Sequence, residues 1–400
     1  MIRSILIFST VFCLSTVALG QWTKKASVPG PQRHHPVTFT IDGKAYYLTG
    51  MTSTNAVLKD FYEYDPANDS WTKKTDFPGT ARGFAYGASI DGKGYIGMGL
   101  SSSAYLNDLW EYDPINDQWT QLATMNGPGR RHPAFIAFQG KIYVGLGDGQ
   151  TGNLNDWYIY TIATDTWVKG PSLPAIARHH PYYFHTGSQV YAGMGHSSSG
   201  IERDWWKFDV VDNKWVQMNN FPGEARVAGT QFTYNNKGHI LGGDGSDHQN
   251  LDTGEFYEYD EVNDTWKELP PAPGQGRWAS GSFVIGDIAY MTSGETGNLT
   301  LYNDLWAYDM TIFNSVDEEE QRNASLSVYP NPANDFINLG SGLDLSEINT
   351  LTIYDPSGRA VSVPAVNRGQ LDISNLSPQL YLLVATLKSG RVFQSRFIKE

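Results

Sequence analysis

Residues 83–119 read GFAYGASIDGKGYIGMGLSSSAYLNDLWEYDPINDQW, and this stretch decides the fold. The segments 83–90 and 94–99 read as two strands, and the Asp91-Gly92 pair between them is a strong hairpin signal. A polar loop leads to a third strand, DLWEYD (108–113), in which apolar and polar residues alternate. A second turn follows before Trp119 opens a fourth strand. The stretch therefore predicts one antiparallel sheet of four strands.

The same unit is repeated along the chain. A tryptophan stands eleven positions ahead of an arginine six times, and successive tryptophans are 49, 48, 48, 48 and 51 residues apart. A period near 48 is the size of a four-stranded propeller blade. The six pairs are Trp22/Arg33, Trp71/Arg82, Trp119/Arg130, Trp167/Arg178, Trp215/Arg226 and Trp266/Arg277.

The repeat resembles that of the kelch family of β-propellers. In that family the second strand ends in glycine, an acidic residue opens the third strand, a tyrosine lies near its end, and a tryptophan opens the fourth. The acidic residues here are Asp60, Asp108, Asp156, Asp204, Glu255 and Asp304. The resemblance covers roughly residues 22–310 and implies an all-β fold, a six-bladed kelch-type β-propeller. The chain departs from the family at the end of the second strand, where Gly-Gly is kept only at Gly242-Gly243.

The strand count predicts how the propeller closes. The sixth unit ends at LWAYD (305–309) without a tryptophan strand, whereas the repeats begin with an isolated one at WTKK (22–25). Joining the two completes six blades and leaves no open sheet edge. We therefore expect residues 21–27 to close the blade of residues 277–310.

The N-terminal segment reads as a secretory signal peptide. Residues 1–20 carry a basic Arg3, an apolar run from Ile5 to Leu19 and a small-residue end, which predicts cleavage before Gln21. The single cysteine, Cys13, lies within this segment. No later run approaches the ~20 apolar residues that span a bilayer. We expect an exported mature protein without disulfides or a transmembrane segment, secreted or attached to the cell surface.

The C-terminal residues form a second module. Residues 311–324 carry four acids and read as a solvated linker between the propeller of residues 21–310 and residues 325–400. The later residues contain Tyr329-Pro330-Asn331-Pro332, a hairpin at IYDPSGR (353–359) and a final Phe397-Ile398-Lys399, within short alternating strands that predict a small C-terminal β-sandwich. This order is similar to the C-terminal sorting domain of the type IX secretion system of Bacteroidetes. The resemblance implies that the type IX secretion machinery is a partner.

The charge excludes one class of partner. The net charge is −13 at pH 7, and charged residues make up only 18% of the chain. Because phosphate binding requires a basic surface, we expect no nucleic-acid partner.

Candidate ligand-binding residues gather on one face of the predicted propeller. The start of each first strand and the loop between the second and third strands lie on this face, which we call the top face. Three blades place a basic-His-Pro cluster there, at residues 33–36, 130–133 and 178–181. The candidates are Arg33, His34, His35, Arg130, Arg131, His132, Arg178, His179, His180, His196, Asp244, His248 and Trp278.

The repeat itself accounts for part of this set. Arginine recurs in every blade, so we expect the repeat arginines and the third-strand acids to hydrogen-bond to loop backbones. The repeat does not require the histidines, because blades two, five and six carry Gly83-Phe84, Val227-Ala228 and Trp278-Ala279 at the same positions.

Two chemistries suit these residues. Guanidinium groups beside histidine recognise carboxylate, sulfate or phosphate through bidentate hydrogen bonds, and three or more histidines could instead hold a divalent metal. Neighbours such as His34 and His35 point to opposite sides of a regular strand, so at most one of each doublet would face the channel. We therefore expect no cofactor. We consider anion recognition at the top face a better explanation of these residues than the binding of a divalent metal.

The expected function is ligand binding at the top face, with a glycan or anionic sugar as the ligand. A protein partner is a further possibility, because propeller faces bind peptides. The alternative is an exported carbohydrate-active enzyme of the epimerase, mutarotase or lyase type that uses His and Arg for proton transfer. Exported kelch proteins with sialic-acid mutarotase activity are its precedent, at the level of the fold. The copper radical oxidases built on kelch propellers need a Tyr–Cys cross-link. Because residues 21–400 contain no cysteine, we do not expect this class of enzyme.

Overall fold

The structure is a computed structural model. It describes residues 22–297 and 299–311 and, further along, 323–325, 328–339, 345–355, 359–362, 366–367, 369–388 and 392–400. The predicted signal peptide of residues 1–20 and nearly all of the predicted linker of residues 311–324 lie outside these ranges. Backbone contacts divide the chain into two compact units, Met1–Met310 and Thr311–Glu400.

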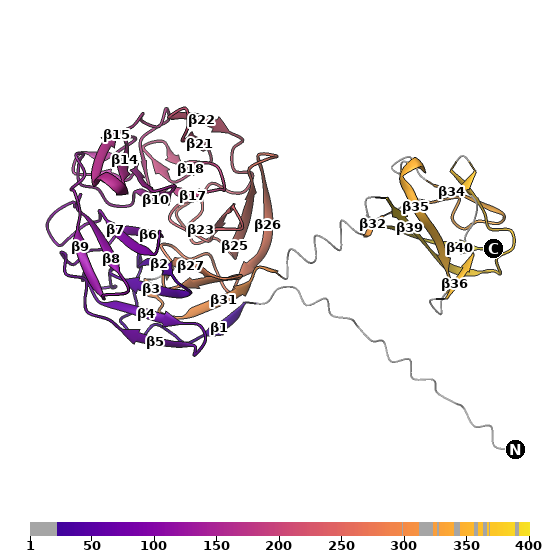
Figure 1. The fold of residues 1–400 in the computed structure, drawn as a ribbon, viewed down its shortest axis with the longest axis horizontal. Coiled ribbons are helices and arrows are strands. Elements are labelled where there is room, and N and C mark those ends of the chain that lie inside the picture. The colour runs from indigo at the N-terminus through magenta and orange to yellow at the C-terminus, as the bar shows by residue number, and fades with distance from the viewer. Residues whose placement is uncertain are drawn as a thin grey trace, which may run out of the picture. The chain divides into compact units, whose positions relative to one another are not determined.

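The first unit is a ring of six antiparallel sheets with four strands each (Figure 1). This confirms the predicted propeller. The first blade contains β2 (Val37–Ile41), β3 (Lys44–Leu48), β4 (Phe61–Asp65) and β5 (Ser70–Lys73), and the second contains β6 (Tyr86–Ile90), β7 (Lys93–Gly97), β8 (Leu109–Asp113) and β9 (Gln118–Gln121). The third blade contains β10 (Ala134–Phe138), β11 (Lys141–Gly145), β14 (Trp157–Thr161) and β15 (Thr166–Lys169), and the fourth contains β17 (Tyr182–His185), β18 (Val190–Gly193), β21 (Trp205–Asp209) and β22 (Lys214–Met218). The fifth blade contains β23 (Thr230–Tyr234), β24 (Lys237–Leu241), β25 (Gly254–Asp260) and β26 (Thr265–Ala272).

The sixth blade closes the ring with a strand from the start of the chain. It contains β27 (Gly281–Ile285), β28 (Ile288–Thr292), β31 (Leu305–Asp309) and β1 (Thr23–Lys25), and β1 lies beside β31 (Figure 1). Thr23 pairs with Ala307 and Lys25 with Leu305 in antiparallel register. The buried Trp22 ring lies 5.2 Å from that of Tyr308. The N-terminal strand therefore closes the last blade, as predicted.

Aromatic rings fill the space between neighbouring blades. In the third strand of the second blade, the Tyr112 ring lies 4.8 Å from Phe61 and 5.4 Å from Tyr46 of the first blade. Tyr64 in turn lies 5.8 Å from Tyr290 of the sixth blade. Buried rings of this kind contribute a large apolar area, so they account for much of the cohesion of the ring.

Each repeat arginine is buried and paired with the acid that opens the third strand of its own blade. The six arginines are at most 6% exposed. In the second blade, Arg82 donates from Nη1 to Asp108 Oδ1 at 2.6 Å and from Nη2 to Oδ2 at 2.7 Å. Burial by itself would raise the pKa of Asp108, but the hydrogen bonds from Arg82 outweigh it and hold that pKa below its usual value. The six pairs are Arg33–Asp60, Arg82–Asp108, Arg130–Asp156, Arg178–Asp204, Arg226–Glu255 and Arg277–Asp304.

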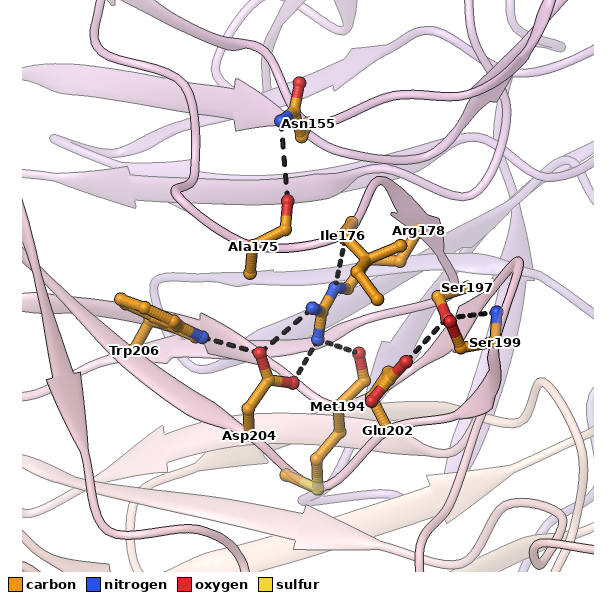
Figure 2. Close-up of polar contacts among 10 residues, drawn as sticks. All are labelled: Asn155, Ala175, Ile176, Arg178, Met194, Ser197, Ser199, Glu202, Asp204 and Trp206. Atoms are coloured by element: carbon orange, nitrogen blue, oxygen red, sulfur yellow. Dashed lines mark hydrogen bonds and ion pairs between the residues drawn. The ribbon is translucent and has the colours of Figure 1, made fainter.

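The fourth blade shows the complete set of contacts (Figure 2). Arg178 donates from both Nη atoms to Asp204, from Nη1 also to the carbonyl of Met194, and from Nε to the carbonyl of Ile176. Trp206 Nε1 donates to the same carboxylate at 2.7 Å. One side chain thus joins the approach to the first strand, the end of the second strand and the start of the third.

The arginine backbone links each blade to the preceding one. In all six blades, the N–H of the glycine after the second strand donates to the carbonyl of the next blade's repeat arginine, including Gly294 to Arg33 across the closure. These glycines have φ between 84° and 102°, a region that other residues rarely enter. The donors and acceptors are Gly50/Arg82, Gly99/Arg130, Gly147/Arg178, Gly195/Arg226, Gly243/Arg277 and Gly294/Arg33.

A layer of short pairings covers the top face. The residue after each repeat arginine forms a bridge with the residue after the second-strand glycine, as in His34 with Met51 and Trp278 with Glu295. Where the pairing extends, it forms β12 (Asp148–Gly149) with β13 (Gly152–Asn153), β16 (Arg178–His179) with β19 (His196–Ser197) and β20 (Gly200–Ile201), and β29 (Glu295–Thr296) with β30 (Thr300–Leu301). Only one short helix lies among the described propeller residues, the 3-10 turn η1 (Ile162–Thr164).

The described residues of the second unit form two facing sheets. One contains β32 (Asn323–Ser325), β40 (Val392–Lys399), β39 (Gln379–Leu387), β35 (Ile348–Tyr354) and β36 (Ala360–Ser362), with β32 parallel to β40. The other contains β33 (Val328–Tyr329), β34 (Phe336–Leu339), β38 (Gln370–Asp372) and β37 (Val366–Asn367), and the 3-10 turn η2 (Leu345–Glu347) precedes β35. Ile337 and Leu371 of the second sheet share one buried core with Ile353 and Leu383 of the first. This is the predicted small β-sandwich.

In the described parts of both units, no helix is long and apolar enough to cross a membrane.

The buried ion pairs predict a sharp contrast between two neighbouring arginines. Arg130→Met leaves the carboxylate of Asp156 in a site that is largely shielded from water, so we expect a loss of about 3–5 kcal/mol in the free energy of unfolding. Arg131→Met removes a guanidinium that is 33% exposed and leaves Asp148 with its contact to His132 Nδ1, so it should cost only about 1 kcal/mol. Urea denaturation of both variants measures the difference. Equal losses would contradict a scaffold role for the repeat arginine.

Candidate functional site

The structure separates the candidate arginines into two groups. Arg33, Arg130 and Arg178 are the repeat arginines described above, and their guanidinium groups are buried in the ion pairs of their own blades. Sequence reasoning expected the repeat arginines to bond to backbone, and they do so, but their main partner is the third-strand acid. Among the candidate arginines, only Arg131 extends toward the surface.

The chain turns sharply at the second residue after each repeat arginine. At this position φ lies between 50° and 58° in all six blades, which is the left-handed region. Regular strand alternation therefore does not apply, and the expectation that His34 and His35 face opposite ways is wrong. Their rings lie 4.9 Å apart, and their Nδ1 atoms are separated by 2.7 Å. The six left-handed residues are His35, Phe84, His132, His180, Ala228 and Ala279.

Three of these residues bring their imidazole rings together. One ring nitrogen from each of His35, His132 and His180 lies within 4.8 Å of the other two. His35 Nε2 is 2.8 Å from His180 Nε2, and the rings of His132 and His180 stack with centroids 3.5 Å apart. All three side chains are buried. We call these three residues the histidine cluster.

Two larger rings cover the histidine cluster. The Phe84 ring lies 4.5 Å from that of His132 and 4.6 Å from that of His35. The Trp278 ring lies 4.6 Å from that of His35 and 5.6 Å from that of His180. Burial lowers the pKa of each cluster histidine well below its usual value, so all three are neutral at physiological pH.

Asp148 connects the histidine cluster to Arg131. His132 Nδ1 lies 3.0 Å from Asp148 Oδ1, and Arg131 Nε donates to Oδ2 of the same carboxylate at 2.9 Å. The Arg131 guanidinium also lies over the ring of Phe84, 5.5 Å from its centroid. The positive charge of Arg131 is therefore partly neutralised. The top face is less basic than its Arg and His residues suggested from the sequence.

Three of the remaining candidate histidines form a chain of rings beside the cluster. The His179 ring lies 5.6 Å from His132 and 5.0 Å from His196, and the His196 ring lies 4.7 Å from His248. Burial lowers the pKa of His179 to about 4, and burial together with His248 lowers that of His196. His34 also has a pKa lowered to about 4 by burial. The candidate histidines thus do meet on one face, mostly in the neutral form.

A pocket of about 480 Å³ opens on the top face and is lined by residues of blades one, two, five and six. His34, Phe84 and Trp278 supply rings, and Asp244, Glu295 and several amides supply polar groups. Burial, together with the charge of Glu295, raises the pKa of Asp244 to about 7, and burial also raises the pKa of Glu295. The lining residues are His34, Met51, Asn55, Phe84, Asp244, His248, Gln249, Asn250, Trp278, Glu295, Thr296, Gly297 and Leu299.

Several lining residues were not among the candidates. Phe84 occupies the repeat position of His35, His132 and His180, so aligning the blades on the arginine would have found it. Met51 occupies the position after the second-strand glycine, as the candidate Asp244 and the acidic Glu295 of the same top-face loops do. Asn55 and Asn250 carry no such positional signal.

A second cavity, of about 550 Å³, follows the axis of the propeller. The first strands of all six blades line it, with Val37, Tyr86 and Tyr183 among the contributing side chains. His35, His132 and His180 line neither this channel nor the pocket on the top face. The histidine cluster is therefore enclosed in protein at the level where the first strands begin.

Comparisons with known proteins identify both units. The family model of the KLHDC2/KLHL20/DRC7 Kelch-repeats domain matches residues 6–180, and that of the secretion system C-terminal sorting domain matches residues 327–400. No curated protein matches the chain. The solved structure titled "Structure of YjhT" is 18% identical with a TM-score of 0.59, and the match covers 70% of this chain and 95% of that chain. At this identity the likeness shows the fold alone.

The matches confirm both predicted resemblances. The sorting domain marks the chain for export through a type IX secretion system and for attachment at the cell surface, as predicted. The chain thus combines a six-bladed β-propeller, whose residues 6–180 match a Kelch-repeats domain, with C-terminal residues 327–400 that match a secretion system sorting domain.

Proposed function

We propose that this exported propeller binds a carbohydrate, as a free sugar or as part of a glycan, in the pocket on its top face. The observation that carries the proposal is the combination of aromatic faces and polar side chains in one concave site. Ligand sites are usually concave and largely apolar, with a few polar groups that orient the ligand. A sugar matches this arrangement because it presents C–H faces to rings and hydroxyl groups to carboxylates and amides.

The aromatic part of the pocket is held in place. Trp278 is only partly exposed, and its ring packs edge-on against His34 at 4.9 Å. The bridge between Trp278 and Glu295 fixes the backbones of these two lining residues relative to each other. A rigid aromatic surface loses little conformational entropy on binding, which favours affinity for a small ligand.

The charges favour a neutral sugar over an anionic one. Asp244 and Glu295 line the pocket, whereas the repeat arginines are committed to ion pairs. Arg131 lies over the ring of Phe84 but does not line the pocket, and it is bound to Asp148. An acidic sugar would have to reach Arg131 while lying beside two carboxyl groups. This revises the expectation of an anionic ligand.

Binding should depend on Trp278. Trp278→Ala removes the principal aromatic surface, and we expect sugar affinity to fall at least about tenfold, as for other aromatic residues that dominate a binding site. A glycan array identifies the ligand, and calorimetry measures its affinity. Tyr105→Ala is the matched control, because Tyr105 is on the same face and does not line the pocket. Equal binding by wild type and Trp278→Ala, or an empty array beside a captured protein partner, would contradict the proposal.

One observation favours the second candidate function, acid–base catalysis on the bound sugar. A carboxyl group whose pKa is near 7 can both accept and donate a proton at neutral pH, and Asp244 has such a pKa. In an epimerase, mutarotase or lyase of this kind, Asp244 would move the proton. The buried histidines are less suited, because their pKa values are low.

The pH dependence tests this role. If the protein interconverts the anomers of its sugar, the rate measured by NMR should follow an apparent pKa of about 7. Asp244→Asn should lower the rate at least about 100-fold, whereas Asp252→Asn, an exposed acid in the same loop, should leave it unchanged.

Stability gives a second readout of the same group. A pKa raised from 3.8 to about 7 means that the folded chain holds the proton more tightly than the unfolded chain. The stabilising contribution is complete below pH 3.8 and is lost as the pH rises toward 7. Asp244→Asn should remove this pH dependence. A full rate and an unchanged stability profile in Asp244→Asn would contradict the assignment.

A further inference from the structure

The histidine cluster has features that packing alone does not explain. His35, His132 and His180 come from blades one, three and four, so they converge across the axis of the propeller. Imidazole nitrogen is a preferred ligand of zinc and of the neighbouring transition metals. Burial keeps these rings neutral, and the neutral ring is the form that binds a metal.

His132 presents an unpartnered nitrogen inside the cluster. A carboxylate can only accept, so the contact of His132 Nδ1 with Asp148 places the ring proton on Nδ1. Nε2 then carries a lone pair, and this buried atom has no hydrogen-bond partner among the described residues. A buried acceptor without a partner is costly. A metal ion bound at Nε2 would satisfy it.

His35 can also offer the lone pair of its Nε2 to a metal ion. Its Nδ1 lies 2.7 Å from His34 Nδ1, so a proton on His35 Nδ1 can be donated to His34. The Nε2 lone pair of His35 then points at His180 Nε2, 2.8 Å away. Tetrahedral zinc ligands are about 3.4 Å apart, so these two nitrogens would separate by only about half an ångström on binding.

Asp148 completes a pattern that is typical of metal sites. Histidines that bind metals usually donate their other ring N–H to a carboxylate, which fixes the tautomer and the orientation of the ring. Asp148 does this for His132 and is itself held by Arg131. We propose that His35, His132 and His180 bind one divalent transition-metal ion, with zinc as the best fit, and that Asp148 positions His132 for it.

The proposed ion would connect blades that do not all adjoin one another. It would tie blade one to blades three and four across the axis, so binding should stabilise the folded propeller. This inference does not depend on the sugar pocket, because the cluster lines neither cavity.

Metal titration of the purified protein tests the proposal. After treatment with a chelator, we expect the wild type to bind one zinc ion per chain by calorimetry and to melt at a higher temperature with zinc than without. Cobalt(II) should give the intense visible bands of a four-coordinate site.

Substitutions by phenylalanine identify the ligands while keeping a ring in place. Phe84 already occupies the equivalent left-handed position of blade two, so His132→Phe and His180→Phe should fold. Both should lose stoichiometric zinc binding and the cobalt bands. His196→Phe, a histidine of the same face outside the cluster, should keep both, and Asp148→Asn should weaken zinc binding 10- to 100-fold.

The outcomes are decisive in either direction. Loss of binding in His132→Phe and His180→Phe, with native melting curves in the absence of metal, supports the site. No stoichiometric zinc binding by the wild type would overturn it. Binding that survives in His132→Phe but disappears in His196→Phe would overturn it as well, because the ion would then be held by the outer histidines.

Discussion

The buried pair between a repeat arginine and a third-strand carboxylate holds each blade together. Its guanidinium group joins three segments of one blade, and its backbone carbonyl accepts a hydrogen bond from the preceding blade. Because a charge in such a site must stay paired, the position of the arginine is fixed to within hydrogen-bond geometry. The residues that follow it are therefore delivered to the axis of the propeller six times, at nearly the same place and with the same left-handed turn. The fold thus provides a ring of equivalent positions whose side chains can vary without changing the scaffold.

This chain uses the ring of positions unevenly. Blades one, three and four carry histidine there, blade two carries phenylalanine, and blades five and six carry alanine. The bulky side chains therefore fill one side of the axis, whereas the alanines leave room on the other side. The pocket on the top face is lined mainly by residues of blades one, five and six, among them Asp244, Trp278 and Glu295. The two proposed sites follow from this asymmetry. One is the enclosed histidine cluster with its neutral ring nitrogens, and the other is the open pocket on the top face with its aromatic rings and carboxyl groups.

The periodicity of the sequence was sufficient to predict the six blades, the closing strand of residues 22–25 and the sandwich after the propeller, because all three follow from strand order. It also placed the candidate histidines on one face correctly. It was not sufficient to predict how their rings are directed. His34 and His35 would diverge on a regular strand, but the left-handed turn at His35 breaks that regularity. A positive φ at histidine is uncommon and has no local sequence signal here, since the same turn occurs at Phe84 and Ala228. The pairing of each arginine with an acid 26 to 29 residues later was missed because it depends on the blade geometry.

¹⁵N NMR of the ring nitrogens of the nine histidines between pH 5 and pH 8 tests whether the scaffold encloses the histidine cluster at the axis of the propeller. We expect His35, His132 and His180 to stay neutral throughout this range and His132 to carry its proton on Nδ1, toward Asp148. Titration of these three rings near the ordinary pKa of 6.5 would contradict it, because rings that gain a proton so readily would be open to water rather than enclosed at the axis.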